Sequence, residues 1–399
     1  MEKSLKKLSG RRLWLRAAAC LAAVLFAVIL TMVSRVEKTE LVSTAGRTFE
    51  KAVVVRILKD NLAEDGNRYG NQKVLLRMSS GALAGQQVEA TSPNGTLFGA
   101  VCRVGMRVVV ISSVSGESSV NTVFSQDREW AVWIFVAVFL LVLCVIGGRN
   151  GIKAALALVF TVICVFCLLL PLIYRGVSPF LAAALVALAT TVATMFLIGG
   201  ISAKSVSAVI GSVSGVLIAG VAAWIFGICA GLNGYNVSEV ESLIFVGQST
   251  NVRVGELLFA GIIISSLGAV MDVAMSISSA IGEIHETDPS LSAQQLFRSG
   301  MAVGRDMMGT MSNTLILAFA GGSLAAIVLN YSYDLPYLQL INSSNTGIEL
   351  MQGISGSLGV ILTVPVSAFV AAELTVRQKK IRGLPSGAER EESLPDEEN

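Results

Sequence analysis

The chain has few charged residues and only one histidine. Lys, Arg, Asp and Glu together make up 15% of its 399 residues, whereas about a quarter is usual in soluble globular proteins. Hydrophobic residues make up 53% of the chain. No basic run interleaved with aromatic residues is present, so we expect no nucleic-acid partner. A chain this apolar is predicted to be an α-helical polytopic membrane protein, with the lipid bilayer as its main partner.

The sequence signatures of common enzymes and cofactor sites are also missing. There is no phosphate-binding loop, no HExxH zinc helix and no hydrolase elbow. Five of the six cysteines lie in apolar runs and only Cys102 lies in polar sequence, so no disulfide is expected within a domain. Cys164 and Cys167 have CxxC spacing, but inside an apolar run we interpret them as small apolar fillers. We therefore expect no enzyme activity, no cofactor and no metal site.

Apolar runs of about 20 residues predict eight membrane helices. They lie near residues 13–33, 130–147, 152–173, 178–199, 206–230, 255–281, 308–329 and 354–375. Lys and Arg cluster before the first run, after the last run and in the loops on the same side, which predicts that both termini are cytoplasmic. The first run ends at Arg35 without a small-residue cleavage site, which favours an uncleaved anchor over a signal peptide.

These patterns divide the chain into four parts. We expect a cytoplasmic tail with an anchor helix (1–36), an extracytoplasmic β domain (37–128), a seven-helix membrane core (129–376) and a disordered cytoplasmic tail (377–399). Within the β domain, strand-like runs occur at 52–58, 73–78, 86–91, 106–112 and 120–125. Five short strands predict a small closed or half-closed barrel. Because the domain has no histidine and no paired carboxylates, we expect it to bind, gate or cap and not to catalyse.

Asp272 is the only formally charged residue in the apolar run from Leu257 to Ile281. Placing a carboxylate at bilayer depth costs about 2.5–3.5 kcal/mol, so such a group is usually partnered, protonated or next to water. With about 100° between successive residues, its helix face also carries Gly261, Ser265, Gly268, Ser276, Ser279 and Glu283. Two hypotheses remain open: the carboxyl binds a proton or cation beside a solute path, or it fixes helix packing by hydrogen bonding. The length of the polar stripe favours the first.

The following two helices carry small and polar faces as well. In the first of them one face carries Asp306, Gly309, Asn313 and Ala320, with Thr310 at its margin. If this helix packs antiparallel to the helix of Asp272, an amide or hydroxyl group comes within reach of that carboxyl. The predicted coupling set is therefore Asp272, Ser276, Ser279, Thr310 and Asn313. Glu283, His285 and Asp306 form a predicted cytoplasmic mouth, where a solvated acidic loop is favoured over a metal or pH-sensing site.

Small residues elsewhere are predicted to serve packing. Gly211 and Gly215 form a GxxxG pair, for which close helix–helix approach is the favoured interpretation. The last helix carries small residues along one side and has Pro365 as a predicted kink. These small residues are Gly353, Gly356, Ser357, Ser367 and Ala371.

The segments GAVMDVAMSI (268–277) and GRDMMGTMSNTLILA (304–318) resemble the YibE/F-like bacterial membrane proteins. The layout is also similar, with an anchor helix, an extracytoplasmic β-rich segment and a multi-helix core, so the resemblance extends over residues 40–375. It implies a multi-pass protein of the bacterial cytoplasmic membrane. It implies no particular substrate and no catalytic residue.

Two functions are consistent with these observations. The favoured one is a proton- or cation-coupled permease or exporter of a small solute or ion, with Asp272 as its coupling group. The alternative is a non-transporting scaffold or accessory subunit that binds an envelope partner through the β domain. A homo-oligomer or a related membrane subunit is an expected partner in both cases. An intramembrane hydrolase is disfavoured because one embedded Asp lacks the second acid or metal that such chemistry needs.

Overall fold

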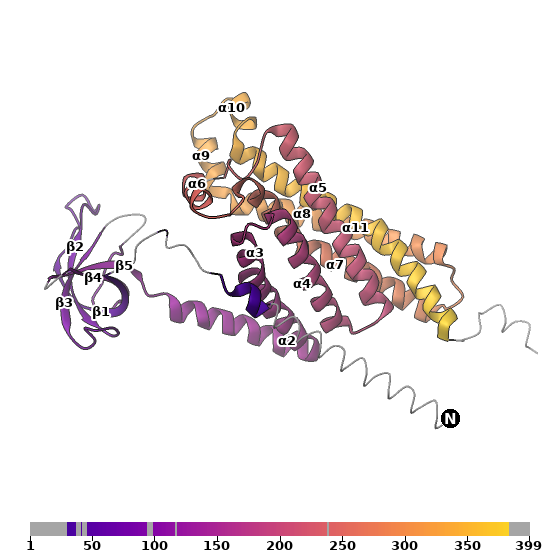
Figure 1. Cartoon of the computed structure of the whole chain (residues 1–399), viewed down its shortest axis with the longest axis horizontal. Coiled ribbons are helices and arrows are strands. Elements are labelled where there is room, and N and C mark those ends of the chain that lie inside the picture. Colours follow the sequence, from indigo (N-terminus) through magenta and orange to yellow (C-terminus); the bar gives the residue numbers. More distant parts are fainter. Residues whose placement is uncertain are drawn as a thin grey trace, which may run out of the picture. The chain divides into compact units, whose positions relative to one another are not determined.

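The computed structural model describes residues 30–36, 41, 46–93, 99–115, 118–237 and 239–382 (Figure 1). The chain divides into two compact units, one formed by Glu40–Ile146 and the other by Met1–Thr39 together with Gly147–Asn399. The predicted basic N-terminal segment, most of the predicted first span and the predicted disordered tail after Arg382 lie outside the described residues.

The first unit contains a closed five-stranded barrel, as the sequence predicts. Its strands are β1 (Arg47–Lys59), β2 (Gln72–Met78), β3 (Gln87–Ser92), β4 (Arg107–Ser115) and β5 (Ser118–Gln126). The strand order around the barrel is β1-β2-β3-β5-β4, and β3 pairs with β5 in parallel while the other pairs are antiparallel. This is a Greek-key barrel of the OB-fold type. Closure leaves no long unpaired strand edge that could recruit another chain.

Alternation along the strands fills the barrel interior. In β2, Gln72, Val74, Leu76 and Met78 point inward and are almost fully buried, while the residues between them are more exposed. Cys102 is also buried in this core, and burial raises the pKa of its thiol. This cysteine is therefore held in its protonated, unreactive form at neutral pH.

The loop between β1 and β2 is organised around Asp60. Its carboxylate accepts hydrogen bonds from Arg68 (2.6 Å), Gln72 (2.8 Å) and the backbone of Asn61 (2.8 Å). The Gln72 side chain also accepts a bond from the backbone N–H of Cys102 at 2.8 Å, so it links the loop to the barrel core. The hydrogen bonds from Gln72 and then Arg68 lower the pKa of Asp60 below its ordinary value of 3.8.

We expect this loop to loosen in acid. Because the pKa of Asp60 is lowered by folding, its contribution to stability is fully present above about pH 4 and is lost as the pH falls through the lowered value. Amide hydrogen exchange in residues 60–72 of the full chain, corrected for the intrinsic rate, should accelerate below pH 4. In Asp60→Asn the same amides should exchange faster at neutral pH and show little further change in acid. Equal acid sensitivity in both proteins would contradict this role.

The longest helical element spans both units and is interrupted at one glycine. It comprises α2 (Glu129–Cys164), a π-helical turn (Val165–Leu169) and α3 (Leu170–Tyr174). Gly148 has φ 52° and ψ −130°, which is not helical and which a residue with a side chain rarely adopts. A straight helix of this length would measure about 69 Å, more than twice the roughly 30 Å thickness of the bilayer hydrocarbon. The element therefore consists of two helical segments that meet at Gly148.

The second unit is a helical bundle that continues from there. Its helices are α4 (Pro179–Gly199), α5 (Ala203–Ala230), α6 (Val240–Ser249), α7 (Leu257–Thr287), α8 (Ala293–Gly322), α9 (Leu324–Ser332), α10 (Tyr337–Ile341) and α11 (Ser344–Arg382). Serine side chains cap the starts of α4, α5 and α8, and Ser292 forms a capping box with Gln295. Helix α11 continues through Pro365.

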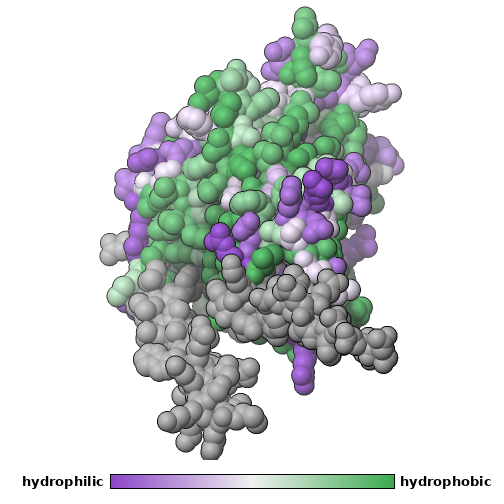
Figure 2. Space-filling view, turned by 90° about the vertical axis from the view of Figure 1, so that its right-hand side faces the viewer, coloured by the Kyte–Doolittle hydropathy of each residue, from purple (hydrophilic) through white to green (hydrophobic). Residues whose placement is uncertain are grey.

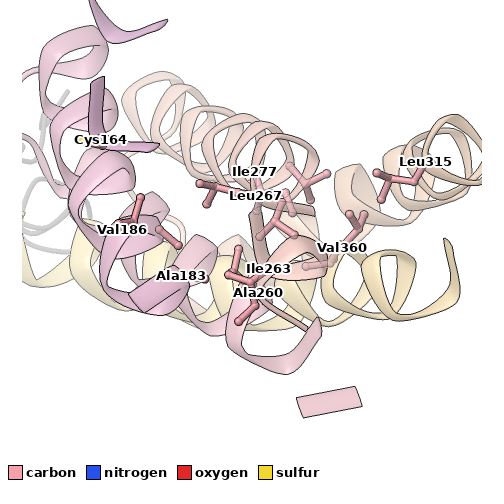
Figure 3. Close-up of a cluster of buried hydrophobic side chains, with 14 of the residues drawn as sticks. Cys164, Ala183, Val186, Ala260, Ile263, Leu267, Ile277, Leu315 and Val360 are labelled. Atoms are coloured by element: carbon pink, nitrogen blue, oxygen red, sulfur yellow. The ribbon is translucent and has the colours of Figure 1, made fainter. Parts of the chain in front are cut away.

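The bundle buries apolar side chains inside and also exposes many of them outside. The buried cluster draws on α4, α7, α8 and α11, as the labelled residues Ala183, Ile263, Leu315 and Val360 illustrate (Figure 3). Hydrophobic residues also cover a broad part of the molecular surface (Figure 2). In the part of the chain that the structure describes, five helical elements are long and apolar enough to span a membrane, or six if the bent pair α8–α9 is one span. An apolar surface of this extent is typical of contact with lipid.

Helices α5 and α11 pack through small residues, as the GxxxG pair predicts. A Cβ atom added at Gly211 would lie 1.9 Å from Ser367 Oγ, and one added at Gly215 would lie 1.7 Å from Thr363 Oγ1. At Gly215 the backbone oxygen of Gly359 would also lie only 2.9 Å away, so a side chain there would push the two helices apart, whereas at Gly211 the Ser367 hydroxyl would first have to turn away. The small residues predicted on one side of α11 are buried in the bundle: Gly353, Gly356, Ser357, Ser367 and Ala371.

The prediction of one continuous helix over 308–329 is wrong. Helix α8 ends at Gly322 and α9 begins at Leu324, with a bend of 65° between them. Gly321, Gly322 and Ser323 lie at the break. Two successive glycines favour a break because each adds roughly 1 kcal/mol of helix cost relative to alanine.

Candidate functional site

The residues around Asp272 occupy one face of α7, and that face points away from the other residues that the structure describes. Gly261, Ser265, Gly268 and Asp272 are exposed, whereas Val270 and other apolar residues on the opposite face are fully buried. A Cβ atom added at either glycine would meet no atom within 4 Å. The helix packs its apolar side inward against α4, α5, α8 and α11, and none of the described helices covers its polar side.

Asp272 has no polar partner in the described part of the chain, since none of its atoms takes part in a hydrogen bond or an ion pair there. Ser265 bonds back to the carbonyl of Ile262 at 3.2 Å, which satisfies its hydroxyl within its own helix. Ser276 and Ser279, one and two turns further on, are half-buried. On this face, the Asp272 carboxyl is therefore the most polar group that has no hydrogen-bond or ion-pair partner among the described residues.

The corresponding face of α8 is also turned outward. Asp306, Gly309, Thr310 and Asn313 are all exposed, and the inward face of this helix is formed by Leu296, Gly300, Gly304 and Leu315. The Thr310 hydroxyl donates to the carbonyl of Met307 at 2.8 Å. No hydrogen bond within the described ranges joins Asp272 to Asn313 or to Thr310. The structure therefore places both polar faces on the outside of the bundle without linking them through these side chains.

The three residues predicted at the mouth lie in different environments. Glu283 is exposed and its carboxylate lies 3.7 Å from the Lys204 ammonium at the start of α5. Asp306 is exposed on α8, whereas His285 lies on the inward face of α7 and is 8% exposed. No group of three or more His, Cys, Asp or Glu side chains suited to a metal ion occurs among the described residues. Cys164 and Cys167 are free thiols, and Cys164 is buried in the apolar cluster of the bundle.

The structure also contains a cavity that the sequence patterns do not indicate. Its volume is about 790 Å³. The break between α8 and α9 and the first turns of α11 form its walls. Most of the lining is apolar, and Asn330, Glu349 and Gln352 supply polar groups. The paired glycines before Ser323 are the sequence signal that could have revealed it.

The cavity and the polar face of α7 are separate. Leu258, in the first turn of α7, lines the cavity. Asp272 lies fourteen residues further along, which corresponds to about 21 Å of helix. A solute in the cavity would therefore not touch the Asp272 carboxyl directly.

A helical bundle with an extensive apolar surface, joined to a small barrel, defines an integral membrane protein of the multi-pass class. Residues 135–377, which are more than half of the chain, match the family model described as YibE/F-like protein. The chain belongs to the YibE/F-like family. The match begins inside α2, so the resemblance expected over residues 40–375 is narrower than predicted and leaves out the barrel. No curated protein and no solved structure matches the chain.

Proposed function

We propose that this protein is a proton- or cation-coupled permease of the bacterial cytoplasmic membrane, with both termini in the cytoplasm and Asp272 as its coupling group. The observation that carries the proposal is the exposed Asp272 carboxyl on an outward helix face, without a polar partner in the described chain. A carboxyl group on lipid-facing surface costs about 2.5–3.5 kcal/mol, so water or another protein surface must meet it in the membrane. A carboxyl group that water reaches can bind and release a proton or cation.

Eight membrane crossings are part of this proposal. The break at Gly148 supports two spans in Glu129–Tyr174, since each half has a length close to the roughly 20 residues that a span needs. Counting α8–α9 as one broken span then gives seven crossings in residues 129–382. The apolar run at 13–33 would supply the eighth. An even number of crossings agrees with basic segments at both ends of the chain.

A second copy of the chain, or a related membrane subunit, would cover the outward polar faces of α7 and α8. Gly261, Gly268 and Gly309 leave open space for an approaching helix. Small residues on a membrane helix allow close contact between backbones, and serines can hydrogen bond across such a contact. In such an assembly the Asp272 groups would lie at or beside an interface and not against lipid.

The cavity at the α8–α9 break would hold the solute. Broken membrane helices commonly border the binding sites of secondary transporters, because the freed backbone groups can contact a substrate. With a mostly apolar lining and Glu349 among its polar groups, the cavity suits a small amphipathic or cationic solute.

Accessibility along α7 tests the proposal. Single cysteines would be placed at positions 261–283 in a cysteine-free background and labelled with a membrane-impermeant maleimide, which reacts only with thiols that water reaches. We expect labelling at 261, 265, 268, 272, 276 and 279, and protection at the buried positions Val270 and Ile277. Spontaneous disulfides between two copies at the same positions would identify an oligomer interface.

Two other results would contradict a wet pathway. If all positions are protected while disulfides form between copies, α7 forms a dry packing surface, and a scaffold function becomes the better account. If all positions are protected and no disulfide forms, the face contacts lipid or a different subunit and the coupling role is lost.

A further inference from the structure

A second cavity lies within the first unit, at the start of α2. Its volume is about 460 Å³, and its lining includes Lys51, Arg107, Glu129, Trp130 and Trp133. Strands β1 and β4 supply the two cationic side chains, and the first turns of α2 supply the carboxylate and both indoles. The barrel strands and the membrane helix thus contribute different chemical groups to one cavity.

The charged groups in this cavity are of both signs and only partly matched. Lys51 forms an ion pair with Glu129, and this hydrogen bond raises the pKa of the Lys51 ammonium. Asp127 is buried, and its carboxylate accepts a hydrogen bond from the backbone N–H of Glu129 at 3.1 Å. Asp127 therefore stabilises the N-terminus of α2. Arg107 is exposed, and its guanidinium makes no hydrogen bond or ion pair with any residue that the structure describes. An unpaired guanidinium beside a cavity favours an anionic ligand, above all a phosphate.

The position of the cavity along α2 indicates that the phosphate group belongs to a membrane lipid. Trp130 and Trp133 are 55% and 65% exposed, and the helix continues into exposed apolar residues such as Phe135, which is 78% exposed. Tryptophan is enriched where membrane helices cross the headgroup layer. The cavity therefore opens at the depth of lipid headgroups, and the apolar face beyond it is suited to acyl chains.

We propose that this cavity binds the headgroup of a zwitterionic aminophospholipid. The lipid phosphate contacts the guanidinium of Arg107 and the ammonium of Lys51, and its amine contacts the carboxylate of Glu129. The indole faces of Trp130 and Trp133 add a cation–π contact to the amine. When the Lys51 ammonium turns from Glu129 to the phosphate, the lipid amine takes its place against the Glu129 carboxylate. A purely anionic headgroup would draw Lys51 away and leave Glu129 without a cation. The site does not depend on transport by the helical bundle.

Lipid binding to the full chain tests this assignment. The detergent-solubilised, delipidated protein would be titrated with phosphatidylethanolamine or phosphatidylglycerol, and bound lipid would be counted by native mass spectrometry. Arg107→Gln should weaken phosphatidylethanolamine binding about tenfold, the usual effect of losing one charge-assisted hydrogen bond. Arg103→Gln is the matched control, because Arg103 is an exposed arginine that does not line the cavity. Its binding should equal that of the wild type.

Competition and fluorescence complete the design. Soluble glycerophosphoethanolamine should compete at least tenfold more weakly than the intact lipid, because it lacks acyl chains. In a variant with Trp14 and Trp224 replaced by phenylalanine, phosphatidylethanolamine with brominated acyl chains should quench the fluorescence of Trp130 and Trp133. Equal binding by the Arg107 and Arg103 variants, tighter binding of phosphatidylglycerol, equal competition by the soluble headgroup, or no quenching would each overturn the proposal.

Discussion

Replacing Gly211 by alanine is expected to destabilise the helical bundle by about 1–3 kcal/mol, the usual cost of forcing an extra methyl group into a packed core. The new Cβ would lie 1.9 Å from Ser367 Oγ and 3.0 Å from Ser367 Cβ, so the Ser367 hydroxyl would have to turn away and α5 and α11 would have to move slightly apart. The measurement is the thermal unfolding midpoint of the detergent-solubilised protein, compared with that of the wild type.

A compensating substitution makes this result specific. Ser367→Gly removes both atoms that the alanine would strike, and Gly211→Ala combined with Ser367→Gly should recover stability relative to the sum of the two single changes. Gly147→Ala is the control, since a Cβ atom there meets nothing within 4 Å. Two results would contradict this contact. One is an unfolding midpoint of Gly211→Ala equal to that of the wild type, and the other is a double variant whose change in stability equals the sum of the two single changes.

Asp272→Asn and Asp272→Ala are expected to assemble normally and to lose ion-coupled movement. Folding should survive because the carboxyl group makes no hydrogen bond or ion pair within the described chain. Function should fail because neither replacement binds a proton or cation at neutral pH. In proteoliposomes with an imposed membrane potential, wild-type protein should carry protons or the coupling cation inward, as followed by an internal indicator dye. Both variants should reduce that signal to the level of empty vesicles.

Glu373→Gln is the control for this experiment. Glu373 is also an acid in a long apolar helix, but it lies near the end of α11, where its carboxylate is 3.5 Å from Arg377. Its replacement should leave ion movement unchanged. Wild-type movement in both Asp272 variants would remove the coupling role, and failure of both to assemble would indicate that Asp272 fixes packing.

Local patterns were enough to predict the barrel and the membrane character of the chain. The β-branched runs around Val54 and Val108 indicate strands, and in the structure the buried residues along them alternate with more exposed ones, a period of two that decides which side faces inward. The stripe on α7 was equally readable, because helical periodicity fixes which residues share a face.

The direction in which that face points could not be read from periodicity. Helical periodicity shows that Asp272 and Asn313 each lie on the polar face of a helix. Both faces turn outward because the opposite, apolar faces fill the bundle core. Contact between neighbouring helices depends on the rotation of each about its own axis, and that rotation is set by all of its packing partners together.

The sequence by itself determined the membrane character of the chain, the five strands, the close-packing glycines and the family, because each depends on residues near one another in the chain. Only the tertiary structure decided that the polar faces of α7 and α8 lie outside the bundle. It also placed the break between α8 and α9 beside a cavity, and Arg107 beside the start of α2. These arrangements bring together side chains from distant segments, and their positions follow from how the helices and strands pack as whole bodies.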